Sequence, residues 1–209
     1  MIVAIVPAAG LSRRMGRPKL ILPLGDGRTV LGTVLNALRD GGVDRLVIVT
    51  PPIDNPITLE LEREGSACGA LIVVPEVQPP DMRDSVTHAL SELKRLEIRP
   101  RTILLCPADS PGISSRLVSM VIAQAKSDPQ AIVIPSFNTK RGHPIALPCS
   151  IAETIPDLPE GVGVNALVKK HADAVIELVV DESGAILDLD TPEDRPAACC
   201  LSPPPRRAG

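Results

Sequence analysis

Aromatic side chains are almost absent from this sequence, which has one phenylalanine, Phe137, and neither tryptophan nor tyrosine. Proteins that bind single-stranded nucleic acid stack bases on aromatic side chains. The net charge of -3 also gives no overall basic excess, which nucleic-acid-binding domains usually carry. We therefore expect no nucleic-acid partner, and any nucleobase has to be held by backbone groups and aliphatic side chains.

Long apolar runs and paired cysteines are lacking as well. The longest apolar stretch, residues 1–11, has about half of the roughly 20 residues that a membrane-spanning helix needs, and no basic segment precedes it as in a secretory signal. The cysteines show no CxxC spacing, so neither a disulfide framework nor a zinc site is indicated; they are Cys68, Cys106, Cys149, Cys199 and Cys200. These absences predict a cytoplasmic protein with reduced thiols and no membrane partner.

The composition is that of a chain that folds. Hydrophobic residues make up 44% and charged residues 22% of the 209 residues, close to the globular average. A chain of this length supports one substantial core. We expect one domain over residues 1–195 and a loose tail over residues 196–209, where proline and arginine occur without an apolar period.

Apolar runs alternate with segments of helical spacing. The runs cover residues 1–6, 45–49, 70–74, 102–106 and 131–134, and the helical segments cover residues 29–39, 57–64, 84–96 and 114–126. Continuous runs rich in Ile, Leu and Val are typical of strands buried on both faces. The order predicts an α/β fold with a doubly wound, mostly parallel sheet. After Pro135 a short strand (142–148), a helix (165–171) and a strand (174–180) predict a mixed C-terminal part.

The loop after the first run is rich in small and cationic residues. It reads PAAGLSRRMGRPK over residues 7–19, and no acidic residue follows before Asp26. Ligands of open α/β sheets bind beyond the carboxyl ends of the strands, and Gly-rich backbone together with Arg and Lys binds phosphate. The loop is therefore interpreted as a polyphosphate cradle, with a solvated basic loop as the alternative. It fits neither the Walker A pattern nor the dinucleotide fingerprint GxGxxG.

Two acidic segments are candidates for a metal site. Asp109 follows the fourth run, on the same side of the sheet as the basic loop, and carboxylate oxygens suit hard cations. Asp188 and Asp190 alternate in ILDLDTPED, and their side chains share one face if this segment is a regular strand. The alternatives are a simple turn at Asp109 and a helix start at Thr191.

The pattern GxSxRMGxxK carries a family resemblance. It is formed by Gly10, Ser12, Arg14, Met15, Gly16 and Lys19. It resembles the signature of nucleotidyltransferases that activate a phosphorylated acceptor, especially the molybdenum cofactor cytidylyltransferase and guanylyltransferase group of MobA-like NTP transferases. The resemblance runs from Met1 to about Asp194 and implies a Rossmann-like nucleotidyltransferase fold.

Site residues follow from the same resemblance. It implies catalytic roles for Arg14 toward the departing phosphates and Lys19 toward the transferred phosphate. It also implies a Mg²⁺ cofactor held by Asp109 and a second carboxylate, for which Asp190 is the first candidate and Asp188 the second. His143, in GHP, is implied near the acceptor, although a turn histidine is the alternative. The implied nucleotide-binding residues are Ala8, Ala9, Gly10, Leu11, Ser12, Arg13, Arg14, Gly16, Lys19, Ser85 and Asp109. Ser85 as an ordinary helix cap is the alternative there.

PAAG (7–10) and GRPK (16–19) look more like the cytidylyl branch than the guanylyl branch. The resemblance therefore implies transfer of CMP from CTP to the molybdenum cofactor, with release of pyrophosphate. A sugar-phosphate or methylerythritol-phosphate acceptor is the alternative enzyme. A non-catalytic nucleotide-binding or cofactor-insertion protein, and a structural α/β interaction module, are the alternatives from other classes. Asn165 departs from the family, because many relatives have a basic residue there.

Overall fold

The computed structural model of the chain describes residues 1–10, 18–159 and 161–189. One eight-stranded sheet organises these residues, with the order β3-β2-β1-β4-β7-β5-β6 and with β8 paired to β5. The strands are β1 (Ile2–Pro7), β2 (Arg45–Val49), β3 (Leu71–Val73), β4 (Thr102–Leu105), β5 (Ile132–Phe137), β6 (Lys140–Arg141), β7 (Ile145–Pro148) and β8 (Val175–Val179). The expected doubly wound α/β fold is confirmed.

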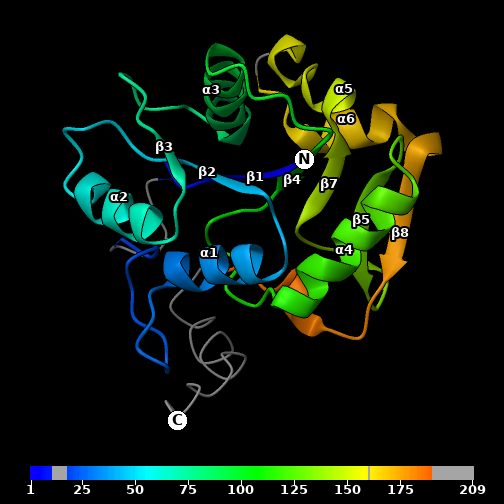
Figure 1. The fold of residues 1–209 in the computed structure, drawn as a ribbon, viewed down its shortest axis with the longest axis horizontal. Coiled ribbons are helices and arrows are strands. Elements are labelled where there is room, and N and C mark those ends of the chain that lie inside the picture. Colours follow the sequence, from blue (N-terminus) through cyan, green and yellow to red (C-terminus); the bar gives the residue numbers. More distant parts are fainter. Residues whose placement is uncertain (11–17, 160, 190–209) are drawn as a thin grey trace.

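Helices cover both faces of the sheet (Figure 1). They are α1 (Val30–Asp40), α2 (Thr58–Ala67), α3 (Met82–Arg95), α4 (Ser115–Ser127), α5 (Cys149–Ala152) and α6 (Val164–Lys170). Short 3-10 turns add η2 (Ile155–Asp157), η3 (Ala172–Ala174) and η4 (Ser183–Ile186). Buried side chains of α1, α2 and α4 pack on one face and those of α3, α5 and α6 on the other, so two core layers sandwich the sheet.

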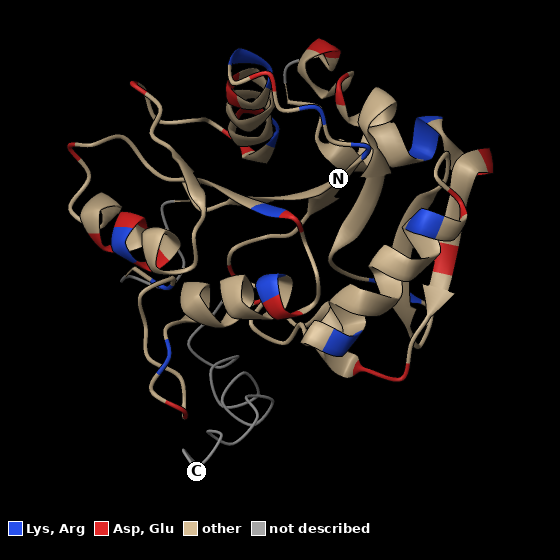
Figure 2. Ribbon diagram, viewed as in Figure 1, with Lys and Arg blue, Asp and Glu red and all other residues tan. Residues whose placement is uncertain are grey.

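Strand β1 shows why apolar and polar residues do not alternate within the apolar runs. Ala4 and Val6 belong to the core layer under α1 and α4, whereas Val3 and Ile5 belong to the layer under α3. Both faces of the strand are therefore buried, and both need apolar side chains. Figure 2 shows the complementary pattern, with most charged residues on the helices and the connecting loops and few on the strands.

Side-chain caps fix where the helices begin. Thr29 Oγ1 accepts a hydrogen bond from Gly32 N at 2.9 Å, and Ser114 Oγ accepts one from Leu117 N at 3.0 Å. Each cap satisfies a backbone donor that has no partner within its helix. Both α1 and α4 therefore begin within one residue of the start that the sequence predicts. Within the described ranges, no helix has the length and apolar character to cross a membrane.

The C-terminal part is mixed, as expected. Strands β1 to β4 are parallel neighbours, but β7 lies between β4 and β5 and is antiparallel to both. Its residue Ala146 pairs with Leu104 on one side and with Val133 on the other. The parallel order is thereby interrupted after β4, at the segment that carries GHP.

The expected strand leading into Asp188 is wrong. Residues 183–186 form the 3-10 turn η4, and residues 187–189 belong to no strand. The backbone there bonds to loops: His143 N donates to Ala185 O at 2.8 Å, and Leu189 N donates to Asp109 O at 2.8 Å. Because these groups have loop partners, no ladder forms over residues 187–189, and the regular strand expected there is absent. Asp190 and residues 191–209 lie outside the described ranges.

Candidate active site

A cavity of about 450 Å³ opens at the carboxyl edge of the parallel strands. It extends from the end of β4, at Pro107 to Asp109, across the end of β1, at Ala9 and Gly10, to Gln78 in the loop after β3. Ser85 reaches it from the first turn of α3. Strand-end loops form this cavity, which agrees with the rule for ligand sites in open α/β sheets.

The walls of the cavity are aliphatic. Pro7, Leu20, Pro79, Pro80, Pro107 and Ala108 supply most of its apolar lining. Phe137, the single aromatic residue, does not line it. The expectation that a nucleobase here has to rely on backbone and aliphatic contacts therefore fits the shape of this cavity.

The backbone of the first loop offers donors from Ala9 onward. Ala8 N donates to Val49 O at 2.8 Å, so its N–H group is taken by the sheet. The N–H groups of Ala9 and Gly10 bond to no other described residue. Ala9 and Gly10 therefore remain available to an anion, whereas Ala8 has a structural position. Leu11, Ser12, Arg13, Arg14 and Gly16 lie outside the described residues.

One ion pair joins two of the predicted site residues. Lys19 Nζ donates to Asp109 Oδ2, although the two residues are 90 positions apart in the sequence. Their side chains are 12% and 22% exposed, so the pair is shielded but still open to the cavity. The fold thus places a cation and a carboxylate at the β4 end of the cavity.

Asp188 lies beside this pair. Ser110 Oγ donates to Asp188 Oδ1 at 2.6 Å, and Leu189 N donates to Asp109 O at 2.8 Å. These two bonds connect the loop after β4 to the segment after η4. Asp109 and Asp188 are therefore brought together from distant parts of the chain.

The donor set fits a cation that is shared with a substrate. Among the described residues no group of three or more His, Cys, Asp or Glu could hold a metal ion. Mg²⁺ usually binds through one or two carboxylates together with substrate phosphates and water. Asp109 and Asp188 supply two carboxylates, which suits such a site and does not suit a metal cage built from protein side chains alone.

His143 faces the same two carboxylates. Its Nδ1 atom is buried and has no hydrogen-bond partner among the described residues. Burial lowers the pKa of His143, and the charges of Asp188 and Asp109 raise it by less, so the pKa stays below its ordinary value. The structure therefore brings the GHP histidine close to both acids.

Three glycines hold these segments together, and the sequence analysis missed them. A Cβ on Gly142 would lie 2.0 Å from Ala185 O, and a Cβ on Gly184 would lie 1.9 Å from Gly112 O. Backbone packs directly against backbone at these points, so only glycine fits. The contacts join the loop after β4, the GHP segment and η4, which carry Asp109, His143 and the approach to Asp188.

Ser85 is buried and lines the cavity, but it is not the helix cap. Its Oγ donates to Asp81 O at 3.2 Å within the first turn of α3. The cap is Asp81, whose Oδ1 accepts from Asp84 N at 3.0 Å. The helix begins at Met82, two residues before the predicted start, because Asp81 satisfies its first free donors.

Gln78 is a second residue that sequence reasoning missed. Its Nε2 donates to Ala9 O at 2.7 Å and lies 3.3 Å from Pro79 O. The side chain thereby connects the loop after β3 to the loop after β1. Its position among three prolines gives no periodic signal, and only the fold reveals the contact.

Known proteins resemble this chain over most of its length. It is 29% identical over 197 residues to a 2-C-methyl-D-erythritol 4-phosphate cytidylyltransferase of Saccharopolyspora erythraea, covering 88% of this chain and 84% of that protein. It is 27% identical over 204 residues to a molybdenum cofactor guanylyltransferase of Rhizobium meliloti, covering 91% and 87%.

Solved structures agree with these relatives. The crystal structure of Rv0371c from Mycobacterium tuberculosis H37Rv matches with a TM-score of 0.77 and 27% identity, covering 95% of this chain and 96% of the other. Its complex with manganese matches with a TM-score of 0.73 and 26% identity, covering 95% and 97%. A divalent cation thus occurs in a structural neighbour of this chain.

The family model of the MobA-like NTP transferase domain matches residues 4–175. This range begins within β1 and contains β2 to β7, the cavity, Lys19, Asp109 and His143. It supports a nucleotidyltransferase activity and leaves the substrates open. Because the match covers far more than half of the sequence, the chain belongs to the MobA-like NTP transferase domain family.

Proposed function

We propose that the protein transfers CMP from CTP to the phosphate of a small acceptor and releases pyrophosphate. The observation that carries this proposal is the cavity at the carboxyl edge, where the backbone N–H groups of Ala9 and Gly10, which bond to no described residue, lie in one space with the Lys19–Asp109 pair. Backbone N–H groups and a lysine bind phosphates, and the carboxylate suits a divalent cation.

The transfer needs no strong base in the protein. The second pKa of a phosphate monoester is about 6, so the acceptor phosphate is largely ionised near neutral pH. One of its oxygens forms a bond to the α-phosphorus of CTP, and the bond from that phosphorus to the leaving oxygen breaks, so pyrophosphate departs with the electron pair. Positioning and charge stabilisation therefore account for catalysis.

Each residue of the site has a task in this transfer. Lys19 holds the transferred phosphate, the N–H groups of Ala9 and Gly10 hold the triphosphate, and Arg14 faces the departing phosphates. Asp109 and Asp188, with Asp190, would hold Mg²⁺, which when bound neutralises part of the charge on the phosphates. His143 borders the acceptor side, where its buried Nδ1 has no partner in the described part of the chain.

The acceptor we propose is the molybdenum cofactor phosphate, from the resemblance of the loop segments PAAG and GRPK to the cytidylyl branch. A methylerythritol phosphate is the second candidate, favoured by the similarity to the cytidylyltransferase of Saccharopolyspora erythraea. Both are phosphate monoesters, so they place the same demand on the site. They differ in size and in the groups that surround the phosphate.

A pyrophosphate-release assay tests the proposal. The full chain is incubated with each of the four nucleoside triphosphates, Mg²⁺ and one acceptor at a time. Release with CTP and one phosphorylated acceptor is the expected result. Nucleotide binding without release in every acceptor pool contradicts it and supports a nucleotide-binding or cofactor-insertion protein. Failure of every triphosphate to raise the melting temperature would support a structural module.

A metal titration tests the role of the carboxylate. Asp109→Asn should raise the Mg²⁺ concentration needed for half-maximal release, because it removes one of two described carboxylates. Asp157→Asn is the matched control, since Asp157 is exposed in η2 and does not line the cavity. Equal titration curves for both variants would show that Asp109 only shapes a turn.

A further inference from the structure

The two ends of the cavity carry different groups. At the β4 end lies the Lys19–Asp109 ion pair, whereas the residues after β3 contribute the uncharged amide of Gln78 and the carboxylate of Asp81. The end of β1 lies between them, because β1 separates β4 from β2 and β3 in the sheet. If nucleotidyl transfer takes place here, the phosphates belong at the end that carries Lys19. The nucleobase then belongs at the end that Gln78 lines.

The hydrogen bonds of Gln78 fix the orientation of its amide. Nε2 is 2.7 Å from Ala9 O and 3.3 Å from Pro79 O. Both partners are carbonyl oxygens that can only accept, so the NH₂ group faces them. Oε1 is left as the unused half of the amide: it accepts no hydrogen bond from a described residue, and it is not among the buried atoms that lack a partner.

We propose that Gln78 Oε1 accepts a hydrogen bond from the exocyclic amino group of the nucleobase and so determines base specificity. Cytosine presents an amino group at its position 4, where uracil presents a carbonyl oxygen. Uracil would therefore place its carbonyl oxygen opposite Gln78 Oε1, and neither of these two acceptors would have a hydrogen-bond donor. The inference rests on the proposed function and adds to it the rule by which CTP is preferred to UTP.

Asp81 is the competing acceptor on this side of the cavity. It lines the same space, but its Oδ1 already accepts from Asp84 N at 3.0 Å as the cap of α3. A carboxylate would also repel the triphosphate, whereas the amide of Gln78 is neutral. Gln78 is in addition bound to Ala9, so its position is coupled to the loop that holds the phosphates. These contacts favour Gln78 over Asp81 as the group that recognises the base.

The test measures binding, not turnover. Dissociation constants for CTP, UTP and inorganic tripolyphosphate are determined by calorimetry with Mg²⁺ for the wild type and for Gln78→Met, which keeps the side-chain volume and removes the amide. The wild type should bind CTP about tenfold more tightly than UTP. In Gln78→Met the dissociation constants for CTP and UTP should become nearly equal, while the binding of tripolyphosphate changes less than that of CTP.

Two further variants separate specificity from structure. Gln124→Met is the matched control, because Gln124 lies on α4, does not line the cavity, and its Nε2 donates to Asp128 Oδ2 at 2.8 Å; it should retain the preference for CTP. Asp81→Asn keeps a capping side chain and removes the charge. A loss of preference in Asp81→Asn with no loss in Gln78→Met would assign recognition to Asp81 and overturn the inference.

The remaining outcomes distinguish the two proposals. A Gln78→Met protein that still prefers CTP by the wild-type factor, or a wild type that binds CTP and UTP equally, overturns the role of Gln78 and leaves nucleotide binding intact. No binding of any triphosphate by the folded wild type overturns the proposed function itself. A uniform weakening of all three ligands in Gln78→Met would mean that Gln78 only fixes the loop of Ala9.

Discussion

Substitution of Gly184 by alanine tests how the acidic side of the site is held. An ideal Cβ on Gly184 would lie 1.9 Å from Gly112 O and 2.7 Å from Gly112 C, both of which are backbone atoms. No side-chain rotation can relieve this overlap. The backbones of η4 and of the loop after β4 have to separate by about 1 Å before the contact becomes tolerable.

The cost of this separation follows from the nature of the contact. Adding a methyl group to a tightly packed site costs about 1–3 kcal/mol. For a chain of this size, about 2 kcal/mol corresponds to a decrease in Tm of roughly 5 °C. The displaced segments also carry the Ser110–Asp188 and Leu189–Asp109 bonds. Asp109 and Asp188 are the proposed metal ligands, and supporting bonds of this kind orient such ligands, so we expect Mn²⁺ affinity to fall by roughly tenfold.

Thermal unfolding and a Mn²⁺ titration of Gly184→Ala measure both effects. Gly163→Ala is the control, because its Cβ would meet no atom within 4 Å and its φ of -82° suits alanine. If Gly184→Ala had the same Tm and the same Mn²⁺ affinity as Gly163→Ala, the backbone contact would not be what positions Asp109 and Asp188. A lower Tm with unchanged Mn²⁺ affinity would leave the effect on stability in place and reject the effect on the proposed metal site.

Three other perturbations check separate parts of the structure. Lys19→Ala should lower the rate of pyrophosphate release by roughly 100-fold or more, because it removes the charge proposed to stabilise the transferred phosphate, and Arg14→Ala should do the same for the departing phosphates. Near-wild-type rates in both variants would reject the phosphate cradle. Burial holds the pKa of His143 below its ordinary value, so the unfolded chain binds this proton more tightly than the folded chain. The free energy of unfolding, measured by urea titration in EDTA, should therefore fall as the pH drops through about 6.5. His143→Gln should lack this part of the pH dependence. Burial and the Glu153 carboxylate raise the pKa of Cys149 to about 11. Glu153→Gln should therefore speed the alkylation of Cys149 by iodoacetamide at pH 8. Peptide mass spectrometry measures this rate, with Cys68 as an unaffected reference.

The strands and most helices could be predicted because their signals are local. Residues 45–49 form a strand with the predicted bounds, and Ser114 caps a helix at the predicted place. Burial on both faces demands continuous apolar runs, and a cap needs one hydroxyl at one position. Both requirements are visible in a few neighbouring residues.

The order of the strands is not a local property. Residues 102–106 and 131–134 look alike in the sequence, yet β7 lies between the strands that they form. The strand predicted after β8 was wrong for a related reason. Its apolar residues suggest a strand, but its N–H and C=O groups bond to the loops at Asp109 and His143 instead of to a neighbouring strand.

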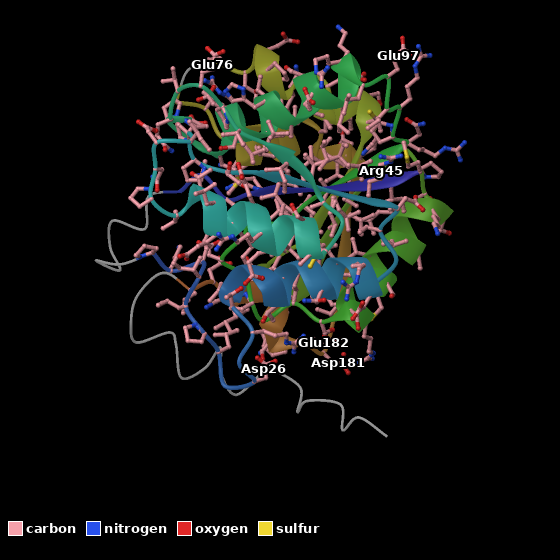
Figure 3. All side chains as sticks on the ribbon, turned by 60° about the vertical axis from the view of Figure 1, so that its left-hand side comes forward. Asp26, Arg45, Glu76, Glu97, Asp181 and Glu182 are labelled. Atoms are coloured by element: carbon pink, nitrogen blue, oxygen red, sulfur yellow. The ribbon has the colours of Figure 1, made fainter. Side chains whose placement is uncertain are left out.

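Charged candidate residues were easier to find than neutral ones. Lys19 follows a loop of small residues, Asp109 follows an apolar run, and Asp188 lies in an apolar segment, so each charge stands out in the sequence. Figure 3 shows other acids, among them Glu76, Glu97 and Asp181, at the periphery of the molecule, so charge alone does not mark a site. Gln78 and the three glycines carry no charge, and their roles depend on contacts with segments far away in the sequence.

The bond between Gln78 and Ala9 has a consequence for the proposed specificity. Asp109 follows the end of β4, and Lys19 is held against it by their ion pair. Gln78 instead lies in the loop after β3, outside the ladder, and its Nε2 donates to Ala9 O at 2.7 Å. If Gln78 recognises the base as proposed, a substitution there changes the group presented to the base and also removes a bond to the loop that is proposed to hold the phosphates. Base choice and phosphate binding are then coupled through Ala9, and only a ligand without a base, such as tripolyphosphate, separates the two effects.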